Sequence, residues 1–85
     1  MYYVYVLRSL RDKKFYTGYT ENLKRRLTAH LSGGVPATSN RRPLELVYYE
    51  ACLSQKDALR REKYLKTTWG KRYLKTRLKS GLESR

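Results

Sequence analysis

Apolar, aromatic and β-branched positions fill residues 2–7 without interruption, a pattern typical of a buried strand. Residues 8–13 are polar and predict a turn. Apolar positions return over residues 14–19, which predicts a second strand paired with the first in a hairpin. Gly18 lies inside this second run and indicates a bulge or the close approach of another group.

A helix is expected after the hairpin. Thr20 is a good N-cap residue, and Glu21 follows it in the first turn, where the helix dipole favours an anion. The helix should run to about Leu31 and end before the glycines at 33 and 34. Residues 32–43 are rich in Gly, Ser and Pro and predict a loop, which at this length in a small domain is often functional.

The second half of the chain predicts one strand and two helices. Pro43 precedes an apolar strand over residues 44–50, and Ser54 with Asp57 resembles a capping box that opens a helix over residues 55–66. A weak break at residues 69–70 leads to a last helix.

That last helix is expected over residues 71–79. The fold class is α+β, with a three-stranded, mostly antiparallel sheet flanked by helices in the order β-β-α-β-α-α. We expect a single domain over residues 1–80 and a polar C-terminal tail over residues 81–85.

The first helix carries polar residues beside its apolar stripe. At about 100° per residue, Leu23, Leu27 and Leu31 define the buried stripe. His30 and Arg26 flank this stripe one turn apart, so their side chains are neighbours.

The next helix places a carboxylate inside its apolar arc, because Glu62 lies between the directions of Ala58 and Leu59. A carboxylate there is costly unless it is paired or bound to a metal. For this residue alone a salt bridge, for example with Arg26, is favoured over a metal. Together, however, an Arg, a His and a Glu on one surface supply a cation for phosphate, a proton carrier and a hard ligand for Mg²⁺.

Charge indicates the class of partner. Twenty Lys and Arg face seven Asp and Glu, which gives a net charge of +13 on 85 residues. Folding does not need this imbalance, since like charges repel, and the usual reason is a polyanionic partner: nucleic acid first, an anionic membrane second. No apolar stretch is long enough to span a bilayer. The single cysteine, Cys52, allows no internal disulfide and favours a reducing cytoplasm.

Two tripeptides make a family resemblance specific. Tyr3-Val4-Tyr5 and Tyr16-Thr17-Gly18 are separated by ten residues and resemble the paired motifs of the GIY-YIG nuclease superfamily. Residues 19–30 resemble the family's first helix, and residues 60–66 resemble its later metal-binding helix. The similarity covers roughly residues 2–75 and is closest to small, single-domain members related to the N-terminal domain of the excinuclease C subunit.

The resemblance implies a metal-dependent endonuclease that hydrolyses phosphodiester bonds in DNA. It implies that Glu62 holds one Mg²⁺ or Mn²⁺, that Tyr5 contacts or deprotonates the attacking water, and that Arg26 neutralises charge on the phosphate. His30 and Tyr16 would relay protons or orient the nucleophile. A free tyrosine has a pKa near 10, so such a base needs help from nearby cations or the metal.

Nucleic-acid contacts are expected from basic residues across the chain. A basic surface reads phosphates and not bases, so sequence specificity should be low, and RNA stays open as a substrate beside DNA. The expected functional context is DNA repair or recombination, with a repair protein as a possible partner. The residues expected to bind nucleic acid are Lys24, Arg41, Arg42, Arg61, Lys66 and Lys71.

Two alternatives stay open at this point. The first is a non-catalytic nucleic-acid-binding module with a GIY-YIG fold, since the last helical segment lacks the Asn that many family nucleases use there. The second is a subunit that supplies a nuclease domain to a larger repair complex. Divalent-metal dependence and the effect of Glu62→Ala separate the nuclease from the binding module.

Overall fold

The computed structural model describes residues 1–83, and its centre is one antiparallel sheet. The strands are β1 (Tyr2–Ser9), β2 (Phe15–Thr20) and β3 (Leu44–Cys52), in the spatial order β2-β1-β3. Both neighbours of β1 pair with it antiparallel, and the pairing with β3 shifts register between Val6 and Leu7. The predicted α+β class and three-stranded sheet are confirmed.

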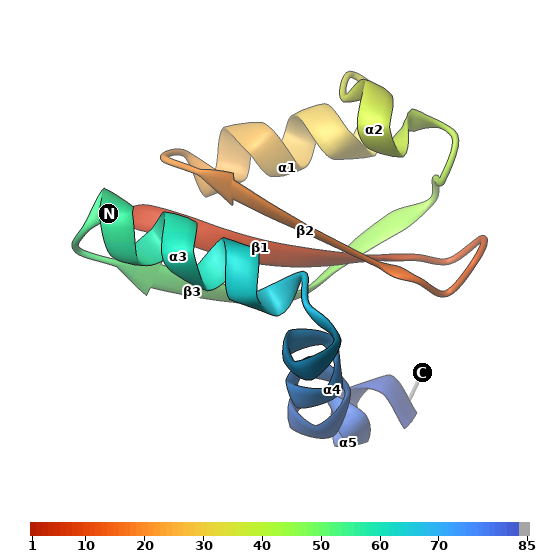
Figure 1. Ribbon diagram of the computed structural model, residues 1–85. Helices are drawn as coiled ribbons and strands as arrows, with labels where there is room; N and C mark the ends of the chain where they lie inside the picture. Colours follow the sequence, from red (N-terminus) through yellow and green to blue (C-terminus); the bar gives the residue numbers. More distant parts are fainter. Residues whose placement is uncertain (84–85) are drawn as a thin grey trace.

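Helices cover both faces of this sheet. In Figure 1, α1 and α2 lie on one side of the sheet and α3 lies on the other, with α4 and α5 beyond the end of α3. The helices are α1 (Leu23–Leu31), α2 (Pro36–Ser39), α3 (Gln55–Leu65), α4 (Thr68–Arg77) and α5 (Lys79–Glu83).

The two covered faces explain why β1 shows no polar alternation in its middle. Its buried residues point alternately into two cores, since successive side chains of a strand face opposite sides. Val4 and Val6 pack with Leu65 from α3 in one core, whereas Tyr5 and Leu7 belong to the other. The sequence of a central strand that is buried on both faces is therefore a continuous run of apolar residues.

The α3–α4 corner depends on a glycine. A Cβ on Gly70 would collide with the backbone of Leu65 and the carbonyl oxygen of Tyr64, so a larger residue would force the two helices apart. The break predicted at residues 69–70 is wrong, because α4 begins at Thr68 with Thr67 as its N-cap. The glycine serves close packing there and does not end a helix.

Other element boundaries also differ from the prediction, among them the end of the last predicted helix, since α4 ends at Arg77 and not at residue 79. The N-cap of α1 is Asn22, whose side chain accepts from the Arg25 amide, because Thr20 still belongs to β2. Within the predicted loop 32–43, Pro36 opens the short helix α2, as proline at a first helical position favours. The expected polar tail from residue 81 overlaps α5, and its residues 84–85 lie outside the described residues.

The helix N-cap at Ser54 is confirmed, whereas the face predicted for α1 is partly wrong. The Ser54 hydroxyl oxygen accepts from the Asp57 amide. Leu31 is 49% exposed, while His30 is fully buried. The buried arc of α1 is therefore rotated towards His30, because the sheet supplies that imidazole with a hydrogen-bond partner.

Candidate active site

Tyr5 lies at the centre of the candidate site, in the middle of β1. It pairs with Gly18 on β2, and its ring lies across that residue, since a Cβ on Gly18 would collide with the Tyr5 hydroxyl. The sequence indicated a close approach at Gly18, and the approaching group is the Tyr5 ring. The side chain of Tyr5 is almost completely buried, at 1% exposure.

A chain of hydrogen bonds runs through the Tyr5 hydroxyl. The Nε of Arg26 donates to the Tyr5 oxygen at 3.4 Å, and Tyr5 Oη lies 2.7 Å from Nε2 of His30. Nδ1 of His30 lies 2.8 Å from Oγ1 of Thr38. An arginine can only donate, so the phenol oxygen accepts from Arg26, and donation of the phenol proton to Nε2 then uses both functions of the hydroxyl. With this orientation Nδ1 carries the ring proton and donates to Thr38, and the imidazole is neutral.

Burial sets the protonation states of this chain. Desolvation raises the pKa of Tyr5, with the hydrogen bond from Arg26 opposing part of the shift. Desolvation, assisted by the charge of Arg26, lowers the pKa of His30. The hydrogen bond to Tyr5 raises the pKa of Arg26. At neutral pH the resting site therefore holds a phenol, a neutral imidazole and a guanidinium.

Tyr16 joins this cluster through its ring. Its centroid lies 5.2 Å from that of His30 and 6.5 Å from that of Tyr5. Tyr16 is partly exposed, and Arg26 is more exposed still, whereas Tyr5 and His30 lie beneath them. The surface that a substrate can touch is therefore formed by Arg26 and Tyr16.

Thr38 is the residue of this cluster that the sequence did not identify. It lies on α2, is fully buried, and has its hydroxyl on His30. The available signal was the long segment 32–43, which contains Pro36 two residues before Thr38. Nothing local in that segment says which of its hydroxyl groups meets the imidazole.

Glu62 approaches the cluster from α3. Its carboxylate is near enough to oppose ionisation of Tyr5, and its side chain is 20% exposed. Its ion pair is with Lys66, at 3.0 Å, so the salt bridge with Arg26 considered from the sequence is wrong. Lys66 follows one turn later on the same helix face, so a local pair replaces the long-range one.

The residues fit a divalent cation that protein and phosphate hold together. Within residues 1–83, no three His, Cys, Asp or Glu side chains come together as a metal cage. Glu62 offers one hard carboxylate, and Lys66 opposite it is more than half exposed and free to turn away. One carboxylate with phosphate oxygens and waters suits Mg²⁺, whereas a cage made by protein alone would need more ligands.

A shallow groove beside Arg26 gives access to the surface of the site. It has a volume of about 330 Å³, and Arg25 and Arg26 both line it along α1. Lys24 is exposed on the same helix but borders a different hollow, beside Tyr3. Arg25 and Arg26 thus present two guanidinium groups to this groove, together with the carboxylate of Glu21.

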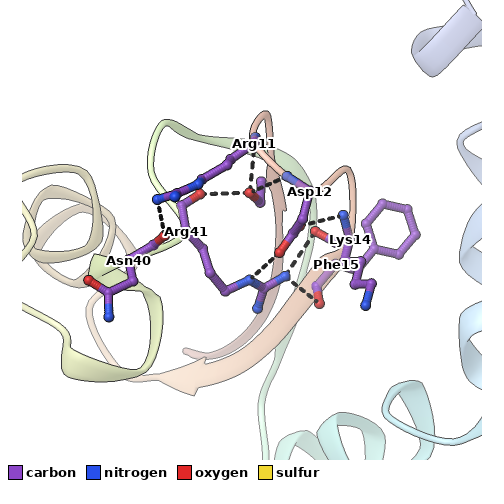
Figure 2. Close-up of polar contacts among 7 residues, drawn as sticks. Arg11, Asp12, Lys14, Phe15, Asn40 and Arg41 are labelled. Atoms are coloured by element: carbon purple, nitrogen blue, oxygen red, sulfur yellow. Dashed lines mark hydrogen bonds and ion pairs between the residues drawn. The ribbon is translucent and has the colours of Figure 1, made fainter.

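Two of the arginines expected to bind nucleic acid, Arg61 and Arg41, have partners within the fold. Arg61 pairs with Glu50 at 2.9 Å and lies over the ring of Tyr73, with its guanidinium carbon 4.9 Å from the centroid. Arg41 pairs with Asp12 at 3.2 Å and donates to carbonyl oxygens of the β1–β2 turn, as Figure 2 shows. Both therefore stabilise the fold.

The other basic residues of the expected set lie in different places. Lys66 forms an ion pair with Glu62, next to the tyrosine cluster. Arg42 is exposed, lies near Gly33 and donates to the Ser39 carbonyl. Lys71 lies on α4 in a separate basic groove. Across residues 1–83, no helix has the length and apolar character that crossing a bilayer requires.

Comparisons with known proteins show which sequences and structures this chain resembles. Residues 1–82 match the family described as the GIY-YIG catalytic domain. A UPF0213 protein of Staphylococcus haemolyticus is 43% identical over 67 residues, which are 78% of this chain and 80% of the relative. A UPF0213 protein of Pediococcus acidilactici is 44% identical over 77 residues, which are 87% of this chain and 78% of the relative.

A solved structure shows that the similarity extends to the fold. The solution NMR structure of a UPF0213 protein of Bacillus halodurans has a TM-score of 0.56 with this chain at 38% sequence identity. The match covers 89% of this chain and 84% of that one. The two proteins therefore share their fold over nearly their whole lengths.

Proposed function

This chain belongs to the GIY-YIG family, a nuclease superfamily, and we propose that it is a metal-dependent endonuclease that hydrolyses phosphodiester bonds in DNA. The observation that carries the proposal is the Arg26–Tyr5–His30 chain of hydrogen bonds. It places a permanent cation and a neutral proton acceptor in contact with the same phenol oxygen. Phosphodiester hydrolysis requires these three functions: charge neutralisation, a nucleophile's proton acceptor and a relay.

The mechanism begins with Arg26. Its bond to Tyr5 is long, at 3.4 Å, and its side chain reaches the surface, so a substrate phosphate can draw the guanidinium outward. This movement opens the place over the Tyr5 hydroxyl to a water molecule. Arg26 then neutralises charge on the phosphate oxygens as the transition state forms.

The proton of the attacking water then moves inward. As the water oxygen bonds to phosphorus, its proton passes to Tyr5 Oη, and the phenol proton passes to Nε2 of His30. The bridging oxygen of the phosphodiester leaves and takes a proton from solvent. The raised pKa of Tyr5 and the lowered pKa of His30 both oppose this transfer, whereas the neutral state of His30 leaves Nε2 able to accept the proton. Thr38 holds His30 in the tautomer that leaves Nε2 without a proton.

Glu62 is the residue that would hold Mg²⁺ or Mn²⁺ in this mechanism. A bound cation would supply Lewis-acid stabilisation of the phosphate and of the leaving oxygen. Tyr16 orients the nucleophile from the exposed side of the cluster. The carboxylate of Glu62 is partly buried, which keeps its position fixed when Lys66 turns away.

We further take residues 1–80 as one nuclease domain with a short C-terminal tail over residues 81–85, in line with the family match over residues 1–82. The high positive charge supports a nucleic-acid substrate bound through its backbone, with low sequence specificity. A role in DNA repair or recombination in the cytoplasm, with a repair protein as partner, completes the proposal.

The test is cleavage of labelled branched, linear duplex and single-stranded DNA with Mg²⁺ or Mn²⁺. Wild type is compared with Glu62→Gln and with the matched control Asp57→Asn, an equal charge change on an exposed residue of the same helix. We expect metal-dependent cutting that Glu62→Gln lowers by about 100-fold or more, as loss of one electrostatic group costs in other active sites. DNA affinity should be unchanged in both variants.

Three outcomes would separate the alternatives. Equal binding with no cutting under either metal favours the binding module that has kept the fold. Cutting that survives Glu62→Gln refutes the metal site at this residue. Weak activity that rises when a co-purified chain is added identifies this protein as one subunit of a larger nuclease.

A further inference from the structure

One hollow on the described surface lies away from the tyrosine cluster. It is a groove of about 470 Å³ between the β1–β2 turn and α4, and no residue of the candidate active site lines it. We call it the turn groove. Its charged lining residues come from three parts of the chain and are Asp12, Lys13, Lys14, Arg41, Lys71 and Lys75.

Positive charge in the turn groove is not neutralised internally. Its one carboxylate, Asp12, is paired with Arg41. In residues 1–83, no salt bridge reaches any of the four lysines that line it. Like charges brought together by folding repel one another, so the arrangement disfavours the folded state unless an anion is bound.

The two lysines on α4 bring like charges together within one helix. Lys71 and Lys75 are four residues apart, so both project from one face of α4 towards the turn. Like charges at this spacing destabilise a helix by a few tenths of a kcal/mol. A solvated helix face would more often mix the two signs. The spacing therefore fits a ligand that carries several negative charges.

The turn is held rigidly for such a ligand. Arg41 donates to Asp12 and to the carbonyl oxygens of Lys14 and Phe15, and its own carbonyl accepts from Ser9 Oγ at 2.6 Å (Figure 2). The backbone amide of Lys14, which donates to Asp12, lowers the pKa of that carboxyl, so Asp12 stays ionised and paired with Arg41. The side chains of the lysines in the turn are left to face the groove.

We propose that the turn groove binds phosphates of the nucleic-acid substrate away from the bond that is cut. This inference rests on the proposed function and adds a second contact to it. Tyr5 pairs with Gly18 in the hairpin. Phe15, which lines the groove, lies three residues before Gly18 on β2. Three residues of strand span about 10 Å. Adjacent phosphates of one duplex strand advance about 3.4 Å along the axis, so the groove contacts the backbone about three or more base pairs from the cleaved bond.

The experiment compares two double variants of equal charge. Lys71→Gln with Lys75→Gln removes both α4 cations of the groove, and Lys56→Gln with Lys79→Gln removes two exposed lysines outside it. Binding of a labelled 20-bp DNA duplex is measured between 50 and 300 mM salt without divalent metal, and cleavage is measured separately.

Counterion release sets the size of the expected effect. Each lost phosphate contact reduces the slope of log affinity against log salt by about 0.9, so the groove variant should lose about 1.8. The same relation gives roughly a 30-fold loss of affinity at 0.15 M salt. The control variant should keep the wild-type slope.

Each result decides the proposal. A groove variant with the slope and affinity of the control refutes the groove, even if the wild type cuts DNA normally. A reduced slope without cleavage by any form supports the groove and refutes the nuclease. Wild type that does not bind the duplex overturns both the groove and the nuclease.

Discussion

Thr38→Val removes one oxygen from the buried hydrogen-bond chain and leaves the shape of the side chain almost unchanged. His30 and Thr38 are both fully buried, and the Thr38 hydroxyl is the partner of His30 Nδ1. Valine would leave a buried N–H without an acceptor and without access to water. An unsatisfied buried donor costs about 1–3 kcal/mol of unfolding free energy. For a domain of 85 residues this lowers Tm by about 5–20 °C.

Thr28→Val is the matched control for this substitution. Thr28 lies on α1, is exposed, and its hydroxyl donates to the Lys24 carbonyl of the same helix. Its replacement should change stability by no more than about 0.5 kcal/mol. Urea unfolding of the three proteins gives the difference directly, provided that the slopes agree.

Two readouts distinguish a lost hydrogen bond from general damage. The nitrogen chemical shifts of His30 should show a neutral ring protonated at Nδ1 in the wild type and a mixture of tautomers in Thr38→Val. Cleavage should fall with the fraction of the correct tautomer while DNA affinity is kept. If Thr38→Val is no less stable than Thr28→Val and keeps the wild-type tautomer, then Thr38 does not orient His30.

Two further predictions follow from the same site. Gly18→Ala places a methyl group against the fully buried Tyr5 ring, and urea unfolding should show a loss of about 1–3 kcal/mol of unfolding free energy. Gly81→Ala, whose Cβ meets nothing within 4 Å, is the control and should be neutral or stabilising. Equal effects of the two substitutions would refute the close approach of Tyr5 to Gly18. The folded chain holds His30 neutral with a pKa below its usual 6.5, so the unfolded chain takes up the proton first and stability should fall as pH drops below about 6.5. His30→Asn should abolish this dependence between pH 5 and 6.5, above the usual range of the carboxylates, and a wild-type stability flat over that interval would contradict it.

The sequence by itself determined the elements whose signals are local. Strand pairing at residues 2–7 and 14–19 follows from β-branched and aromatic runs separated by a polar turn, and Ser54 marks a helix start because an N-cap needs only its own neighbours. The family followed from the spacing of short motifs. Net charge indicated the class of partner without any structure, since a sum over residues needs no coordinates.

Boundaries failed where a competing local choice existed. Thr20 and Asn22 are both good caps, and the decision depended on how far β2 stays paired with β1. Gly70 resembled a helix end, but its lack of a Cβ serves the packing of α4 against α3. In the first case the deciding contact is made by a strand distant in the sequence, and in the second by the helix that immediately precedes Gly70.

Only the tertiary structure decided which polar groups become partners. Helical periodicity put His30 at the edge of a stripe, yet the Tyr5 hydroxyl, 25 residues away in the sequence, makes it the most deeply buried residue of α1. Arg61 and Arg41 are engaged by carboxylates that no local pattern identifies. The physical reason is that a hydrogen bond or an ion pair forms within about 3 Å, a distance fixed by how strands and helices pack.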